Sequence, residues 1–68
     1  MITKKQLGAN IRHHRTVAGL SQESLAFSIN SEKCSISEWE TGKHWPYLPK
    51  VLAMCEVLGI EPNDLMLR

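Results

Sequence analysis

The spacing of its apolar residues constrains the fold of this chain more than any other feature. In several short segments they recur at steps of three and four residues, which is the period of one face of an α-helix. Glycines follow three of these segments, at Gly19, Gly42 and Gly59, where they can end a helix. No segment alternates as a strand does. The pattern therefore predicts an all-α chain of short helices with tight connections.

Local signals at the segment ends predict five helices. They are expected at about residues 4–18, 22–29, 32–41, 48–58 and 62–67. Thr3 and Ser21 precede the first two as N-caps, because their hydroxyl groups can accept hydrogen bonds from unpaired backbone N–H groups. Asn30 tolerates the left-handed backbone of a turn, and Pro62 suits the start of the last helix.

The helical faces also predict the core. Leu25, Ile36 and Trp39 are expected to be buried on the second and third helices. On the fourth helix, the expected buried stripe consists of Leu48, Val51, Leu52, Cys55 and Leu58. Phe27 falls off the apolar stripe of its helix and is expected to be partly exposed.

The chain is long enough for one small domain, spanning residues 1–68, and no more. Chains of this size bury only about 60% of their unfolded surface, so a homo-oligomer is expected to support the fold. The net charge is only +1, but the charged residues are unevenly distributed along the chain. Residues 1–22 hold four cationic side chains and no acid, whereas residues 51–68 hold three acids and one arginine. A basic front and an acidic back would orient the domain on an anionic surface, and scattered surface charge is the alternative.

Several classes of protein are excluded by what the sequence lacks. Two cysteines are too few for a disulfide framework or a structural zinc site, and free thiols suit the cytoplasm. No apolar run approaches the roughly 18 residues that cross a membrane. A glycine-rich phosphate loop, a nucleophile elbow and a carboxylate pair are missing, so no enzyme activity and no cofactor are expected. His13 and His14 point about 100° apart on a helix and cannot share a metal ion.

Only a few residues join the second and third helices, which is the helix-turn-helix arrangement. The residues around it are more specific. They read Ile11-Arg12-x-x-Arg15, Gly19-Leu20-Ser21-Gln22-Glu23-x-Leu25-Ala26, Ile36-Ser37-x-Trp39-Glu40-x-Gly42, Pro46-x-Leu48 and Leu58-Gly59-Ile60. This pattern, over about residues 5–66, closely resembles the Cro/C1-type helix-turn-helix family of phage repressors and bacterial regulators. The resemblance implies a compact, five-helix, lambda-repressor-like domain that binds double-stranded DNA and regulates transcription as a repressor.

The third helix is the recognition helix in this family, and its outward face would meet base edges in the major groove. Ile36, Trp39 and Glu40 share the inward face at about 100° per residue. The residues left for base reading are Glu32, Lys33, Cys34, Ser37 and Glu38. A lysine can donate to guanine, a glutamate can accept from cytosine N4, and a cysteine offers an apolar contact to a thymine methyl. A merely exposed thiol is the alternative for Cys34.

Affinity is expected to come from contacts to DNA phosphates. Gln22 lies at the N-terminus of the second helix, where N–H groups and the helix dipole favour an anion, and the resemblance implies a phosphate clamp there. The other candidates flank the recognition helix or lie on the first helix: Arg12, Asn30, Ser31, Lys43, His44 and Trp45. The alternatives are that Trp45 stacks on Pro46 or Pro49 and that the others are merely solvated.

Two charged residues have a structural role by resemblance. Arg15 and Glu40 match positions that form a partly buried ion pair between the first and third helices in this family. Two independent surface charges are the alternative. His14 stands where the family has an apolar residue, so a partly buried histidine is expected.

The expected assembly is a homodimer with two recognition helices in successive major grooves, about 34 Å apart on a pseudo-palindromic operator. The dimer contact is expected at Ile60, Leu65, Met66 and Leu67. A phage repressor or Cro, a restriction–modification controller and an antitoxin regulator all fit, and activation through contact with RNA polymerase fits as well as repression. Control by a small molecule is not expected. The rival interpretation is an antitoxin-like interaction module of the same fold, which binds a toxin or another regulator and for which DNA is secondary.

Overall fold

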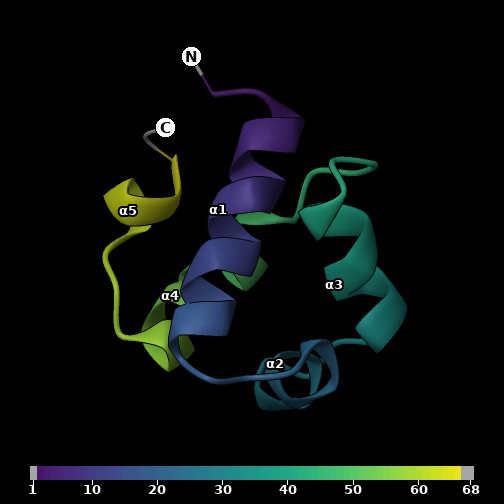
Figure 1. The fold of residues 1–68 in the computed structure, drawn as a ribbon, viewed down its shortest axis with the longest axis vertical. Coiled ribbons are helices and arrows are strands. Elements are labelled where there is room, and N and C mark those ends of the chain that lie inside the picture. Colours follow the sequence, from purple (N-terminus) through teal and green to yellow (C-terminus); the bar gives the residue numbers. More distant parts are fainter. Residues whose placement is uncertain (1, 67–68) are drawn as a thin grey trace.

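The computed structural model describes residues 2–66 and contains five α-helices in this range (Figure 1). They are α1 (Lys4–Val17), α2 (Gln22–Ser28), α3 (Lys33–Glu40), α4 (Leu48–Leu58) and α5 (Pro62–Met66). The expected fold class is confirmed, and the expected helix ends within this range differ from the observed ones by at most one residue. The expected continuation of the last helix to Leu67 lies outside the described residues.

The helix ends follow from local capping. The Thr3 hydroxyl accepts a hydrogen bond from the backbone N–H of Gln6 at 3.1 Å, and the Gln6 side chain accepts one from the Thr3 N–H at 3.0 Å. Ser21 Oγ likewise accepts from the Ser24 N–H at 2.9 Å, so both expected N-caps are confirmed. Asn30 has a φ of 57°, which is the left-handed conformation expected for it.

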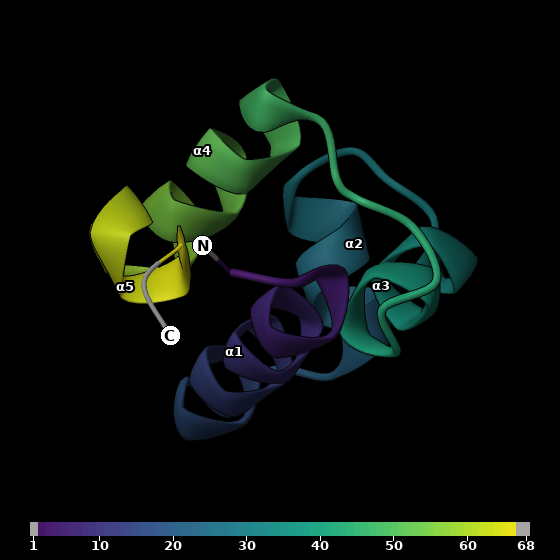
Figure 2. The same ribbon diagram turned by 90° about the horizontal axis from the view of Figure 1, so that it is seen from above.

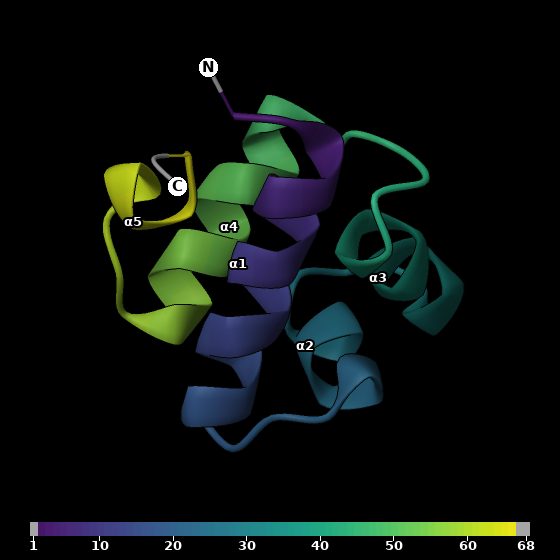
Figure 3. The same cartoon turned by 45° about the horizontal axis from the view of Figure 1, so that its top comes forward.

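The five helices surround a common core. α1 packs against α3 on one side and against α5 on the other, and α3 and α5 in turn pack against α2 and α4 (Figures 1 and 2). In Figure 3, α1 crosses in front of α4, with α2 and α3 to one side. Because α2 also contacts α4, the helices close around a single core.

Two side chains donate hydrogen bonds to distant backbone carbonyls and hold this arrangement. Asn10 Nδ2 on α1 donates to the Leu65 carbonyl of α5 at 2.8 Å. Lys50 Nζ on α4 donates to the carbonyls of Ile29 and Asn30, at 2.6 and 3.1 Å, just past the end of α2. An ammonium group suits this position, because unpaired carbonyls carry the negative end of the helix dipole. The turn after α2 is therefore tied to α4.

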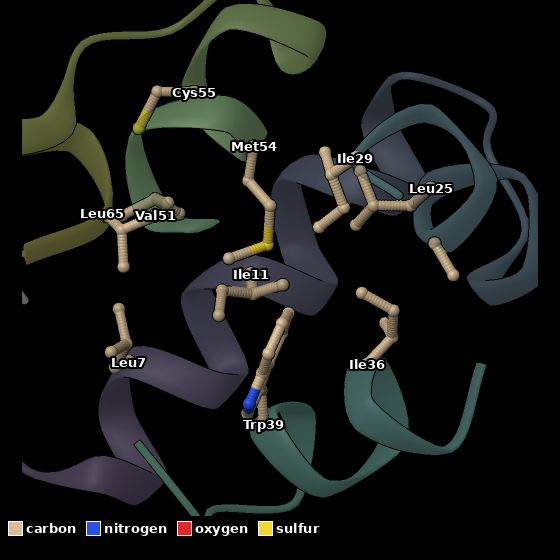
Figure 4. Close-up of a cluster of buried hydrophobic side chains, with 11 residues drawn as sticks. Leu7, Ile11, Leu25, Ile29, Ile36, Trp39, Val51, Met54, Cys55 and Leu65 are labelled. Atoms are coloured by element: carbon tan, nitrogen blue, oxygen red, sulfur yellow. The ribbon is translucent and has the colours of Figure 1, made fainter. Parts of the chain in front are cut away.

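The core receives side chains from every helix. Figure 4 labels its buried side chains, which are Leu7, Ile11, Leu25, Ile29, Ile36, Trp39, Val51, Met54, Cys55 and Leu65. The expected burial of Leu25, Ile36 and Trp39 is confirmed. Phe27 is exposed, as its place off the apolar stripe predicts.

The expected buried face of α4 is wrong at two positions. Leu48 is 66% exposed and Leu52 is 49% exposed. Met54, which the expected stripe omits, is fully buried and points toward Ile11 of α1 (Figure 4). The apolar surface of α4 is wider than the surface that its neighbours cover, so the side chains at one edge remain in solvent. Burial on α4 therefore follows the neighbouring helices rather than hydrophobicity alone.

Gly8 allows α1 to approach α3 at close range. A Cβ atom there would overlap the carbonyl oxygens of Trp39 and Glu40 at the end of α3. Gly42 is similarly confined: its φ is 79°, and a Cβ atom would lie 2.9 Å from the Cα of Lys5. The expected turn at Gly42 is confirmed. The spacing of apolar residues could not predict the role of Gly8, because the residues that it contacts are distant in the sequence.

Replacing Gly8 with alanine should lower the free energy of unfolding by about 1–3 kcal/mol, because the backbones of α1 and α3 must separate. The loss should appear although alanine is favoured over glycine by about 1 kcal/mol inside a helix. Urea denaturation followed by circular dichroism measures it. Ala9→Gly, at the exposed neighbouring position, is the control and should lose helix propensity only. A G8A variant as stable as the parent would contradict the close contact.

Candidate nucleic-acid interface

The turn between α2 and α3 fixes the orientation of the two helices relative to each other. It comprises residues 29–32, and the Ser31 N–H donates to the Ala26 carbonyl at 2.8 Å. Ala26 is buried, and its small side chain permits close packing of the two helices. Together with the left-handed Asn30, these contacts form the expected helix-turn-helix.

The third helix buries one face and presents the other. Its inward face consists of Ile36, Trp39 and Glu40, as predicted. Of the five predicted base-reading residues, Glu32, Lys33 and Cys34 are exposed, whereas Ser37 and Glu38 are half-buried. The surface most available to a ligand is therefore the first turn of α3.

A hollow of about 530 Å³ opens beside α3 where it meets α1 and α2, and we call it the α1–α3 hollow. Its lining comes from all three helices: Arg12, Arg15, Ser21, Gln22, Glu23, Lys33, Glu40 and Thr41. The fold thus brings two predicted phosphate-binding residues, Arg12 and Gln22, next to one predicted base-reading residue, Lys33. Within residues 2–66, the side chains of Arg12 and Lys33 form no ion pair, so both cations can meet an anion.

A second hollow, of about 350 Å³, lies between α3 and the loop that leads to α4. Ser35, Glu38, Trp39, His44, Trp45 and Tyr47 line it. The Glu38 carbonyl accepts from the N–H groups of Lys43 and His44, at 2.9 and 3.4 Å, which keeps the loop near α3. Glu38 therefore stands between the recognition face and the predicted phosphate-binding residues of the loop.

Arg15 and Glu40 form the ion pair that the resemblance implies. Arg15 Nε lies 2.6 Å from Glu40 Oε2, and Nη2 lies 3.1 Å from Oε1, so the guanidinium fork binds both carboxylate oxygens. The two side chains are 14% and 3% exposed. Arg15 Nη1 also donates to the Leu20 carbonyl at 2.8 Å. The alternative of two independent surface charges is therefore wrong.

Gln22 joins this pair, which the sequence did not indicate. Its Nε2 donates to Glu40 Oε1 at 3.0 Å. The network thereby links α1, α2 and α3 within the α1–α3 hollow. No spacing signal could have found it, because only folding brings Arg15, Gln22 and Glu40 together.

The predicted dimer residues have different environments. Leu65 is fully buried in the core of its own chain, so its prediction as an interface residue is wrong. Its side chain packs inward because α5 lies against both α1 and α4. Ile60 is half-buried and Met66 is exposed, whereas Leu67 lies outside the described residues.

The other titratable groups of residues 2–66 do not form a metal site. Residues 2–66 contain no group of three or more His, Cys, Asp or Glu that could hold a metal ion. The rings of His13 and His14 lie edge to face, 5.1 Å apart, and His14 is half-buried as expected. Burial, and then the charges of Asp64 and Glu61, raise the pKa of the Cys55 thiol, which keeps it neutral. In the same part of the chain, no helix has the length and apolar character needed to cross a membrane.

Comparison with known families and curated proteins identifies one matching family. A family model described as a helix-turn-helix domain matches residues 6–67. None of the curated proteins matches the sequence.

Several solved structures are similar to this chain. The restriction-modification controller protein C.AhdI from Aeromonas hydrophila is 34% identical, with a TM-score of 0.87 over 91% of this chain and 94% of that chain. The P22 c2 repressor, solved in complex with the synthetic operator 9T, is 27% identical, with a TM-score of 0.82 over 87% and 89%. A hypothetical transcription factor from Neisseria, NHTF, is 27% identical, with a TM-score of 0.88 over 97% and 76%.

Replacing Glu40 with alanine should lower the free energy of unfolding by about 3–5 kcal/mol, because it leaves the guanidinium of Arg15 partly buried and unpaired. Urea denaturation at low and high salt measures the loss, which should persist at high salt because salt screens a buried pair poorly. Glu56→Ala is the control, since Glu56 is exposed, and should change stability by less than about 0.5 kcal/mol. An equal effect of the two substitutions would contradict a structural role for the pair.

Proposed function

Because this chain belongs to the helix-turn-helix domain family and is a DNA-binding transcriptional regulator rather than an enzyme, we propose that it represses transcription by placing α3 in the major groove of a specific operator. The observation that carries this proposal is the defined presentation of α3. Its inward face is held by core packing and by the Arg15–Glu40 pair, while Lys33 and Cys34 stand exposed in its first turn. The operator complex of the similar P22 c2 repressor supports this use of the fold.

Base recognition is assigned mainly to the first turn of α3. Lys33 is exposed and can donate to guanine O6 and N7, and Cys34 can pack on a thymine methyl. Glu32 lies at the leading end of the helix. Ser37 and Glu38 are half-buried, so they would contribute only where the groove comes closest, and there Glu38 would accept from cytosine N4.

Phosphate contacts are assigned to both sides of α3. On one side, Arg12 and Gln22 line the α1–α3 hollow. The remaining candidates lie in the turn before α3 and in the loop after it, and they are Asn30, Ser31, Lys43, His44 and Trp45. Donors on both sides of a recognition helix match the two phosphate backbones that border a major groove.

A second copy of the chain completes the proposed regulator. We assign the contact to α5 and the segment before it, where Met66 and part of Ile60 retain accessible apolar surface. A dimer adds buried surface to a domain whose own core is small. A two-fold axis there would set two α3 helices about 34 Å apart on a pseudo-palindromic operator.

Selection from a random pool of duplexes should recover a pseudo-palindromic sequence. Lys33→Ala should relax the preference at one base pair of each half-site, at a cost of about 1–3 kcal/mol. Lys43→Ala, at another exposed lysine, is the matched control and should weaken binding to all duplexes alike, since phosphates carry no base identity. An unchanged preference for Lys33→Ala would remove Lys33 from the base-reading set. Failure of the parent to select any sequence would favour the interaction-module alternative.

Met66→Glu should raise the dissociation constant of the dimer by at least about tenfold, because it places two unpaired carboxylates in an apolar contact. Sedimentation velocity over a concentration series measures this constant. Val17→Glu changes an exposed apolar residue at the end of α1 and should leave the dimer intact. If the Met66→Glu variant dimerises like the parent, the dimer contact lies on another surface. If the parent binds its operator as a monomer, the proposed dimer is excluded.

A further inference from the structure

Gln22 and Glu40 meet where three helices converge. Glu40 Oε1 accepts from Gln22 Nε2 at 3.0 Å, and the same oxygen accepts from Arg15 Nη2 at 3.1 Å. A carboxylate without a proton can only accept, so the amide nitrogen of Gln22, and not its oxygen, must face Glu40. The orientation of this amide is therefore determined before any ligand binds.

The amide nitrogen of Gln22 has a second hydrogen to donate. Gln22 lines the open α1–α3 hollow, and among residues 2–66 its side chain is bonded to Glu40 alone. Glu40 is nearly buried and its charge is matched by Arg15, so it presents little negative charge to an approaching anion. A glutamine that was not held in this way would lose rotamer freedom on binding, which weakens a contact.

We propose that Glu40 is a positioning residue for DNA binding. Arg15 orients its carboxylate, and the carboxylate holds the Gln22 amide so that the second N–H meets a DNA phosphate. This inference rests on the proposed function, because it requires a phosphate at the α1–α3 hollow. It assigns to the Arg15–Glu40 pair a role in binding that is separate from its role in stability.

The charge of Glu40 makes these two roles separable. Glu40→Gln removes a negative charge near the DNA, so long-range electrostatics alone would raise the affinity. Positioning predicts the opposite sign. The substituted amide replaces one carboxylate oxygen with an NH2 group. If the remaining oxygen accepts from Arg15 Nε, as Oε2 does in Glu40, the new NH2 group stands in the place of Oε1. Two NH2 groups cannot bond through their hydrogens, so the Gln22 amide would turn over or be released.

A double-mutant cycle on the affinity for the selected operator duplex tests this proposal. The variants are Gln22→Met, which keeps the length of the side chain without its donors, Glu40→Gln, and both together. Gln22→Met should weaken binding about tenfold. Glu40→Gln should weaken binding about three- to tenfold in the parent, but by less than about twofold when Gln22→Met is already present. Circular dichroism at the assay temperature checks that each variant is folded.

Three results would overturn the proposal. They are an unchanged or higher affinity for Glu40→Gln, an equal loss in both backgrounds, and no loss for Gln22→Met. If the parent binds no duplex selectively, the proposed function itself fails. If the parent binds and the Gln22→Met variant binds equally well, only the inference about Glu40 fails.

If Glu40→Gln does not fold, nuclear magnetic resonance of the unsubstituted protein decides the question. The side-chain amide of Gln22 should then be as rigid as the backbone of α2 in the absence of DNA. Asn63 is exposed, and its side-chain amide, which forms no hydrogen bond within residues 2–66, is the reference. A Gln22 amide as mobile as that of Asn63 would overturn the proposal.

Discussion

The contact between α1 and α3 determines how the recognition surface is presented. α3 has only eight residues, so it cannot hold an orientation without its neighbours. Gly8 lets the two backbones meet, and the fork of Arg15 binds both oxygens of Glu40. Rotation of α3 about its axis would break both hydrogen bonds and withdraw Trp39 from the core. The helix that is proposed to read DNA is therefore aligned by a helix that contributes none of the base-reading residues.

Features that depend on residues close together in the sequence were predictable. Thr3 and Ser21 cap their helices through hydrogen bonds three residues away, and Asn30 supplies its own left-handed turn. The helix bounds followed from these signals and from the apolar period. The Arg15–Glu40 pair joins distant segments, and it was foreseen only because the chain resembles a known family.

The remaining features depend on which surfaces meet after folding. Leu52 and Met54 are both apolar residues of α4, and the positions of the neighbouring helices decide that Met54 is buried and Leu52 is not. Leu65 could be assigned equally well to a core or to a dimer contact from its hydrophobicity. The bond from Gln22 to Glu40 and the contact at Gly8 involve partners on other helices, which the spacing of apolar residues along one helix does not reveal.

The bonds of Lys50 change how the positive charge of the chain should be counted. Of the eight Lys and Arg residues, Arg15 is held by Glu40, Lys50 is held by two carbonyls, and Arg68 lies outside the described residues. The five that remain are Lys4, Lys5, Arg12, Lys33 and Lys43. Each cation that neutralises a DNA phosphate displaces about one condensed counterion. Because Arg15 and Lys50 are bonded within the chain, DNA binding should release fewer counterions than the total of Lys and Arg residues suggests.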